Sequence, residues 1–289
     1  MSAKQGLLLY TPADAERNRW FITQLCQYAE SEGLSLRLCL VESGNPFIPF
    51  RQYPDTGFLI NRSRFGSISE YAERSLHIPC FNSAYVTGIT NYKYLTYLEM
   101  HGEHGIPMAK TQQIGRNQPL PELPYPLVAK PEDGHGGEGV ALIRNEAELL
   151  RYRADFHTAP PEPTYPFLVQ EPVVFGWDVR VYVLFGEIYA AVLRTSETDI
   201  RSNFSLGGHA ALIEPDADMR ALVQQVQEIM PLDFAGVDIL RRADGSYLLG
   251  EIEDAVGCRM LYKLTDRDPA RDHIRTVAGI LTGRITRGS

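Results

Sequence analysis

The sequence predicts a parallel α/β unit over residues 1 to about 88, followed by a mixed, largely antiparallel α+β unit. Short apolar runs alternate with amphipathic helical patterns over the first part of the chain, as in β-α-β folds. Two proline-rich segments, 114–125 and 159–166, interrupt the middle of the chain and predict loops. Near the end, Gly236-Val-Asp-Ile-Leu240 and Gly250-Glu-Ile-Glu253 predict two buried strands, joined by a hairpin turn at 242–245.

Composition excludes several classes of protein. At 289 residues, the chain can form one large domain or two to three small ones. Its net charge of -8 argues against general affinity for nucleic acid or anionic membranes. The four cysteines are scattered without a C-x-x-C pair, which is typical of reduced thiols. Because neither a signal peptide nor a membrane-length apolar run is present, we expect a soluble, cytoplasmic protein, with a homo-oligomer left open.

The N-terminal unit is expected to alternate strands and helices. An apolar run at Leu7–Tyr10 predicts the first strand, and an amphipathic pattern predicts a helix over Arg17–Glu32 that ends at Gly33. The pattern then predicts strands at Leu34–Val41, Gly57–Asn61 and Pro79–Phe81, and a short helix at Ile68–Leu76.

The remaining elements follow the same reasoning. A periodic helix is expected after Asn91, ending near Gly105. Further helices are expected at Asn145–Phe156, Asp216–Met230 and Ala270–Leu281. Apolar runs predict strands at Pro126–Lys130, Phe167–Glu171, Val179–Phe185 and Ile188–Arg194, besides the acidic hairpin.

The acidic hairpin carries the strongest chemical signal. Glu251 and Glu253 are two residues apart and therefore share one face of their strand, and Asp238 joins them if the two strands pair. An ionised carboxylate in a buried strand is costly without a partner. Three convergent carboxylates therefore predict a bound cation, and oxygen ligands suit Mg²⁺ or Mn²⁺. The alternative is a hairpin whose acids point to solvent.

Phosphate-binding features lie between the two proline-rich segments. Four glycines in the stretch 133–139 would let backbone amides approach phosphate oxygens, although such clusters more often make turns. Lys130 ends an apolar strand, where a lysine needs an anionic partner or an escape to water. Lys93 alone could be a solvated helix residue. The chain has neither a Walker loop nor a dinucleotide-binding glycine fingerprint.

In this order, the motifs resemble the ATP-grasp superfamily, and most closely the RimK-like carboxylate–amine ligases. The resemblance covers almost the whole chain. It rests on Lys93, Pro126-Leu-Val-Ala-Lys130-Pro, the glycine stretch, Leu168-Val-Gln-Glu171-Pro, Asp178-Val-Arg180, Arg201-Ser-Asn203, Gly236-Val-Asp238 and Glu251-Ile-Glu253.

The resemblance implies an ATP-grasp fold with a Rossmann-like N-terminal domain. The expected domains are residues 1–88, a central subdomain with the glycine flap at 89–166, and a C-terminal subdomain with the metal site at 167–289.

The resemblance also implies the roles of the site residues. The ATP phosphates would be contacted by Lys93, Lys130, Gly136, Gly137 and Gly139. Adenine and ribose would be held by Gln170, Glu171, Val173 and Asp178. The catalytic residues would be Arg194 and Arg201, which neutralise phosphate and developing acyl-phosphate charge, and Asn203, which assists them. Mg²⁺, or Mn²⁺, would be bound by Asp238, Glu251 and Glu253. The substrates would be contacted by Arg180 and Arg259.

The implied activity is ATP-dependent joining of a carboxylate to an amine through an acyl phosphate, releasing ADP and phosphate. The amine could belong to an amino acid, a peptide or a protein tail. Glu253 departs from the family, which commonly has Asn there, so metal preference could differ. The alternatives are a small-molecule kinase on the same fold and a non-catalytic ATP-binding or structural protein.

Overall fold

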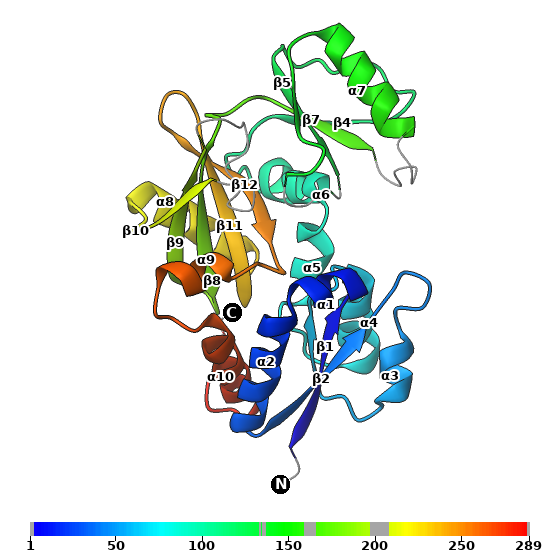
Figure 1. The fold of residues 1–289 in the computed structure, drawn as a ribbon, viewed down its shortest axis with the longest axis vertical. Helices are drawn as coiled ribbons and strands as arrows, with labels where there is room; N and C mark the ends of the chain where they lie inside the picture. Colours follow the sequence, from blue (N-terminus) through cyan, green and yellow to red (C-terminus); the bar gives the residue numbers. More distant parts are fainter. Residues whose placement is uncertain (1–2, 133, 135–136, 159–165, 197–207, 288–289) are drawn as a thin grey trace.

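The structure is a computed structural model that describes residues 3–132, 134, 137–158, 166–196 and 208–287. Its strands form three separate sheets, which are arranged one after another along the long axis of the molecule (Figure 1). In the described part of the chain, no helix is both long enough and apolar enough to cross a membrane.

The N-terminal sheet is parallel, with strand order β2-β1-β3, which confirms the predicted β-α-β alternation. Two differences are local. The expected first helix is divided at Asn18 into two, and the expected strand at 79–81 is a single bridge between Leu59 and Cys80. The elements are β1 (Lys4–Tyr10), α1 (Pro12–Arg17), α2 (Arg19–Ser31), β2 (Leu34–Leu40), α3 (Ile48–Gln52), β3 (Phe58–Asn61) and α4 (Gly66–Leu76).

The C-terminal sheet is antiparallel throughout, with strand order β10-β9-β8-β11-β12. Alternation along its strands separates two faces. Val181 and Val237 face α8, whereas Tyr182 and Phe234 pack against helices α2, α9 and α10. The elements are β8 (Trp177–Leu184), β9 (Glu187–Thr195), β10 (His209–Ile213), α8 (Ala217–Ile229), β11 (Phe234–Arg241), β12 (Tyr247–Glu253), α9 (Arg259–Leu264) and α10 (Pro269–Leu281).

The central sheet is also antiparallel, in the order β4-β7-β5-β6, and it shares a small apolar core with α7. The strand at 167–170 pairs with both β4 and β5. The sheet therefore continues past residue 166, where a boundary was expected. Its elements are β4 (Thr111–Ile114), β5 (Leu127–Pro131), β6 (Ala141–Ile143), α7 (Glu146–Thr158) and β7 (Phe167–Gln170).

The segment between the first and second sheets is helical. It contains α5 (Ala84–Thr90), α6 (Lys93–Tyr97) and a π-helical turn, η1 (Leu98–Glu103). Val86, Met100 and Met108 are buried in the same apolar cluster as α8 and the C-terminal sheet. The expected boundary at residue 88 divided this segment between the N-terminal domain and the central subdomain, but its apolar side chains belong to the C-terminal core.

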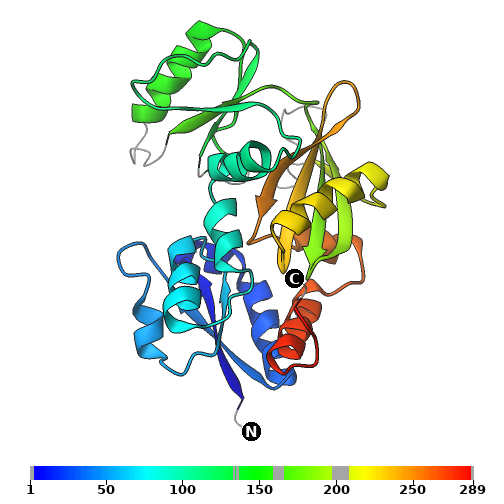
Figure 2. The ribbon, with the colours of Figure 1, turned by 180° about the vertical axis from the view of Figure 1, so that it is seen from behind.

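Hydrogen bonds fix the N-terminal domain to the C-terminal sheet. The Asn82 amide donates to the carbonyls of Phe234 and Asp254, at 2.9 and 3.1 Å, and its Oδ1 accepts from the Asp233 and Phe234 N–H groups. Arg62 Nη2 donates to the Val256 carbonyl at 2.8 Å. Helices α2 and α10 pack together beside these contacts, as the reverse view shows (Figure 2).

Candidate active site

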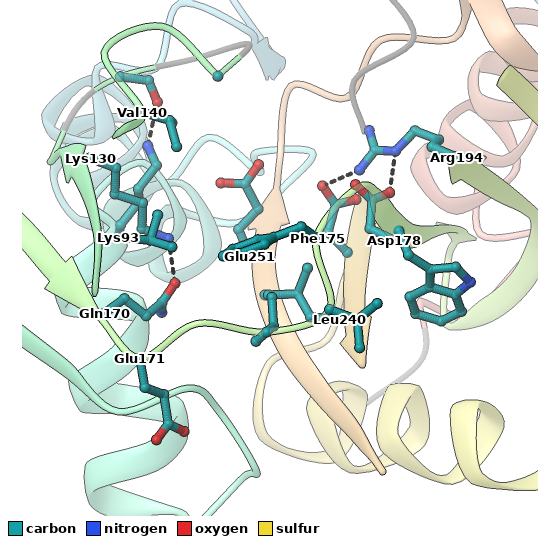
Figure 3. A pocket seen from close by; sticks show the side chains of 18 of the residues that line it. Lys93, Lys130, Val140, Gln170, Glu171, Phe175, Asp178, Arg194, Leu240 and Glu251 are labelled. Atoms are coloured by element: carbon teal, nitrogen blue, oxygen red, sulfur yellow. Dashed lines mark hydrogen bonds and ion pairs between the residues drawn. The ribbon is translucent and has the colours of Figure 1, made fainter. Parts of the chain in front are cut away.

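A cleft of about 1000 Å³ lies between the central and C-terminal sheets. One wall carries Lys130 and Gln170 and the opposite wall carries Asp178 and Arg194, with Glu251 between them (Figure 3). The motifs quoted from the sequence are far apart in the chain, and the fold brings them to this one place.

Lys130 is on β5, and its side chain is held by a neutral partner. Its Nζ donates to Gln170 Oε1 at 3.2 Å, while the Gln170 amide donates to Thr111 Oγ1 at 2.8 Å. Burial lowers the pKa of Lys130 to about 8; the Glu251 carboxylate opposes this shift and the charge of Lys93 adds to it. The cleft therefore contains a buried ammonium that would be stabilised by an anion.

Lys93, at the start of α6, reaches the glycine stretch. Its Nζ donates to the carbonyls of Glu132 and Gly134, the former at 3.3 Å. Gly137 and Gly139 have φ angles of 79° and 70°, a conformation that favours glycine. A Cβ at Gly139 would lie 2.7 Å from Pro131 Cγ, so a larger residue would push the loop away from β5.

The segment 171–176 connects the central sheet to the C-terminal sheet along the edge of the cleft. The Glu171 N–H donates to the Lys110 carbonyl at 3.0 Å, and the Val174 N–H donates to the Arg241 carbonyl at 2.9 Å. The Val173 N–H makes no hydrogen bond with any described residue. Val173 and Phe175 line the cleft, so the Val173 N–H is a free backbone donor beside an apolar surface.

Charged side chains alternate across four strands of the C-terminal sheet. Asp178 is opposite Arg194, Arg180 is opposite Asp238, and Asp238 is opposite Glu251. This register confirms that the two hairpin strands pair and that their three acids share a face. A β-bulge at Gly250 sets the register: Asp238 pairs with Glu251 and the next residue, Ile239, pairs with Leu249.

Asp238 already has two cationic partners. Its carboxylate accepts from Arg180 Nε and Nη2, both at 2.7 Å, and from Arg194 Nη2 at 2.8 Å. Burial alone would raise the pKa of Asp238, but the two arginine charges hold it well below its usual range. Arg180 and Arg194 therefore already balance the charge of Asp238, so its burial does not by itself require a metal ion.

The remaining carboxylates fit a divalent cation. Four acids (Asp178, Asp238, Glu251 and Glu253) and two arginines leave two negative charges on this face. Glu253 Oε2 is 2.5 Å from Arg180 Nη1 but lacks hydrogen-bond alignment, and Glu251 has no ion-pair partner among the described residues. No described group of three acidic, His or Cys side chains could hold a metal ion by itself. Mg²⁺ is commonly held by one or two carboxylates together with substrate phosphate oxygens, which the two glutamates allow.

A second, more polar cleft of about 1420 Å³ continues from the first, and both are lined by Lys93, Arg194 and Glu251. Arg259 lines it, as expected for a substrate contact. Arg180 lines it too, and its guanidinium contacts Asp238 and Glu253.

The sequence reasoning missed the contribution of the N-terminal domain. Asp14, Arg17 and Arg64 line the second cleft, and Asp14 forms ion pairs with both arginines. These residues follow β1 and β3, at the carboxyl ends of parallel strands, where α/β sheets bind their ligands. That rule could have identified them. Gly136, Arg201 and Asn203 lie outside the described residues.

Comparisons with known proteins agree with this arrangement. The family model of the RimK-like ATP-grasp domain matches residues 105–277. Human β-citrylglutamate synthase B is 32% identical over 206 residues, which are 68% of this chain and 52% of that protein. Human N-acetylaspartylglutamate synthase A is 33% identical over 175 residues, which are 57% and 43% of the two chains. The chain thus spans about half the length of the curated relatives it matches.

A solved structure shows the same fold. D-alanine–D-alanine ligase from Bacillus anthracis, complexed with ATP, matches 98% of this chain and 100% of its own with a TM-score of 0.74 and 16% identity. The ATP-grasp fold expected from the sequence is confirmed. Because the family model covers more than half of the 289 residues, the chain belongs to the RimK-like ATP-grasp family.

Proposed function

We propose that the chain is an ATP-dependent carboxylate–amine ligase that forms an amide or peptide bond and releases ADP and phosphate. The observation that carries this proposal is the continuity of the two clefts. The first has two lysines and a free hinge amide on one side and acids on the other, which suits a nucleotide with a metal ion. The second is rich in arginine, which suits an anionic substrate.

The proposed chemistry has two steps. A substrate carboxylate oxygen attacks the γ-phosphorus of ATP, the bond to the β-phosphate oxygen breaks, and an acyl phosphate and ADP form. The amine nitrogen then attacks the acyl carbon, and the tetrahedral intermediate expels phosphate as the amine loses its proton. Both reactants in the first step are anionic, so cations must reduce their repulsion.

We assign the residues accordingly. Lys93 and Lys130, with Gly137 and Gly139, would hold the phosphates, and the Val173 N–H would bind the adenine edge beside Gln170 and Glu171. Asp178 orients Arg194, which lines both clefts and would stabilise charge at the transferring phosphoryl group. Arg180 would position Asp238 and Glu253, and Arg259 would contact the substrate. Glu251 and Glu253 would hold Mg²⁺, which when bound neutralises phosphate charge.

Residues outside the described part complete the proposal. Gly136 extends the phosphate loop in the sequence, and Arg201 and Asn203 would add charge and hydrogen bonding during transfer. The carboxylate and amine substrates are proposed as a class, and the amine as an amino acid, peptide or protein tail.

Hydroxylamine trapping tests this function. With ATP, Mg²⁺ and a panel of carboxylic acids, the ligase should release ADP and phosphate together and form a hydroxamate with the acid it activates. Arg201→Ala should abolish trapping while leaving ATP binding largely intact, because the charge it balances develops only in the reaction. A stable phosphorylated hydroxyl product without hydroxamate would instead identify a kinase. Absence of nucleotide turnover across the panel would contradict both enzymatic functions.

A further inference from the structure

A third cavity, of about 480 Å³, opens between the N-terminal domain and α9. We call it the arginine–aromatic pocket, because its lining includes Arg17, Arg62 and Arg259 together with Trp20, Phe21 and Tyr262. No acidic residue lines it, although the whole chain has a net charge of -8. It shares Arg17 and Arg259 with the second cleft, so the two spaces are adjacent.

Arg62 is the unusual member of this pocket. It is only 5% exposed, and a cation so buried is normally paired with a carboxylate. Its Nε donates to Tyr10 Oη at 2.6 Å and its Nη2 to the Val256 carbonyl at 2.8 Å, and both acceptors are neutral. Within the described residues, no carboxylate lies at ion-pair distance from Arg62, and its Nη1 makes no hydrogen bond. Asp254 acts on Arg62 only from a greater distance.

The other two arginines differ in how fully they are neutralised. Arg17 is paired with Asp14 at 2.5 Å. Arg259 donates to the Arg17 carbonyl at 3.1 Å and has no ion-pair partner in the described chain. The pocket therefore holds two guanidinium groups, of Arg62 and Arg259, that no described carboxylate contacts at ion-pair distance. Guanidinium groups bind carboxylates with paired hydrogen bonds.

The aromatic wall gives the pocket an apolar side. Trp20 and Tyr262 are in edge-to-face contact, with ring centroids 4.7 Å apart, and Trp20 remains 57% exposed. The Arg62 guanidinium carbon lies over the Phe21 ring, 5.2 Å from the ring centroid. A large exposed tryptophan beside an unbalanced buried cation suits a ligand that has an apolar segment and an anionic end.

We propose that the arginine–aromatic pocket binds a substrate carboxylate that does not react, with Arg62 and Arg259 as the specificity-determining cations. The substrate's reacting end would lie in the adjacent second cleft, and its intervening carbon chain would lie against Trp20 and Tyr262. This inference rests on the proposed ligase function and adds a substrate class to it: an acid or amine that carries a further carboxylate. The alternative is a purely structural Arg62 that ties the Val256 carbonyl to the N-terminal domain.

Trp20 provides a direct binding signal, because the chain has only one other tryptophan, Trp177. Fluorescence would be titrated without ATP using two matched pairs of probes: glutarate with its diamide glutaramide, and L-alanine with L-alaninamide. The first pair tests a dicarboxylic acid substrate and the second tests an amino acid as the amine. We expect a saturable change with the carboxylate member of at least one pair, at least tenfold weaker binding of its amide, and loss of the signal in Trp20→Phe.

Variants separate recognition from folding. Arg62→Met and Arg259→Gln should each weaken binding of the carboxylate probe at least fivefold and leave the affinity for the amide probe unchanged. Arg62→Lys should bind the carboxylate probe more tightly than Arg62→Met. Arg275→Gln, an exposed arginine on α10, is the matched control and should bind like wild type. If Arg62→Met does not fold, the carboxylate affinities of Arg62→Lys and Arg259→Gln can still be compared with that of the wild type.

Several outcomes would overturn the inference. These are equal binding of acid and amide, unchanged binding in both arginine variants, and displacement by inorganic phosphate at lower concentration than by either carboxylate. Hydroxamate formation with simple monocarboxylates, together with no carboxylate-dependent signal, would overturn the pocket assignment and leave the ligase function standing. Specific carboxylate binding without any ADP or hydroxamate formation would contradict the ligase function instead.

Discussion

Lys130 is a partly buried lysine whose only described hydrogen-bond partner is a neutral amide oxygen. An isolated charge in such a place is costly. Burial therefore lowers the pKa of Lys130 to about 8. Phosphate oxygens would remove this cost. Lys130, whose charge is costly when no anion is bound, is therefore the residue that should bind the nucleotide.

Replacing Lys130 by Ala should weaken ATP binding by about 1.5–3 kcal/mol, the range for a charge-assisted hydrogen bond. In the wild type, ATP binding favours the protonated ammonium, so affinity should fall as pH rises above about 8, by at most about tenfold per pH unit. Lys130→Ala should lack this pH dependence. Titration calorimetry at pH 7.5, 8.5 and 9.5 measures both effects, with Lys4→Ala as the control. Wild-type affinity in Lys130→Ala would place the phosphate site elsewhere.

Glu251 and Asp238 are directly opposite one another but should respond differently to loss of charge. Glu251→Gln removes a carboxylate without an ion-pair partner, so stability should change by less than about 1 kcal/mol while turnover is lost. Asp238→Asn leaves Arg180 and Arg194 without their shared acid, at a cost of about 3–5 kcal/mol.

Urea unfolding and ATP turnover with Mg²⁺ measure the two effects separately. Glu187→Gln, an exposed acid on β9, is the control. Glu253→Asn restores the residue common in the family and should keep activity. Full turnover in Glu251→Gln with Mg²⁺ present would rule out its metal role.

At the scale of elements, the segment 171–176 joins two sheets, and its Val173 N–H makes no hydrogen bond with a described residue. Val173→Pro removes that N–H and should weaken ATP binding about tenfold, because one hydrogen bond to the nucleotide is lost. Val173→Ala keeps the donor and should stay within about threefold. The measurement is ATP affinity by calorimetry, with circular dichroism to confirm the fold. Equal affinity in the two variants would show that adenine does not use this amide.

The same scale shows what a sequence can and cannot predict. The alternation of Val237, Asp238 and Ile239 predicts a half-buried strand, and the spacing of Glu251 and Glu253 predicts a shared face. Neither pattern predicts the partners of Asp238, because Arg180 and Arg194 come from other strands, 58 and 44 residues away in the chain.

Short elements were missed for a related reason. The six residues of α9 and the five of β10 are too short for a periodic signal. The helical pattern after Asn91 could be recognised, whereas the seven-residue α5 could not, and the sheet against which both pack depends on tertiary contacts. The lining of the second cleft by Asp14, Arg17 and Arg64 likewise depends on how the N-terminal domain docks.

At the scale of the whole molecule, His273 connects the packing of α10 to the stability of the protein. It is 2% exposed, lies against the rings of Phe185 and Phe234, and has no hydrogen bond on either nitrogen. Burial lowers the pKa of His273 to about 3, and the charge of Arg62 adds to this shift. The folded protein therefore keeps this imidazole neutral.

The unfolded chain takes up a proton at His273 near pH 6.5, whereas the folded protein does so only near pH 3. Its contribution to stability is therefore complete above pH 6.5 and falls as pH decreases towards 3, by at most about 1.4 kcal/mol per pH unit. His273→Leu should lose less stability than wild type between pH 7 and 4.5 in urea unfolding, and exposed His209→Gln should match wild type. Parallel curves for His273→Leu and wild type would contradict this.

The hydrogen bonds of Asn82 affect how the N-terminal domain could be exchanged between members of the family. One amide holds the N-terminal domain to the first residues of β11 and to the Asp254 carbonyl, immediately after the acidic strand. A chimera that took residues 1–82 from another family member would replace Asp14, Arg17, Arg62 and Arg64 while leaving both lysines and the acidic strand in place. Such a graft should change which acid is accepted and keep nucleotide affinity, provided that the donor segment also ends in asparagine.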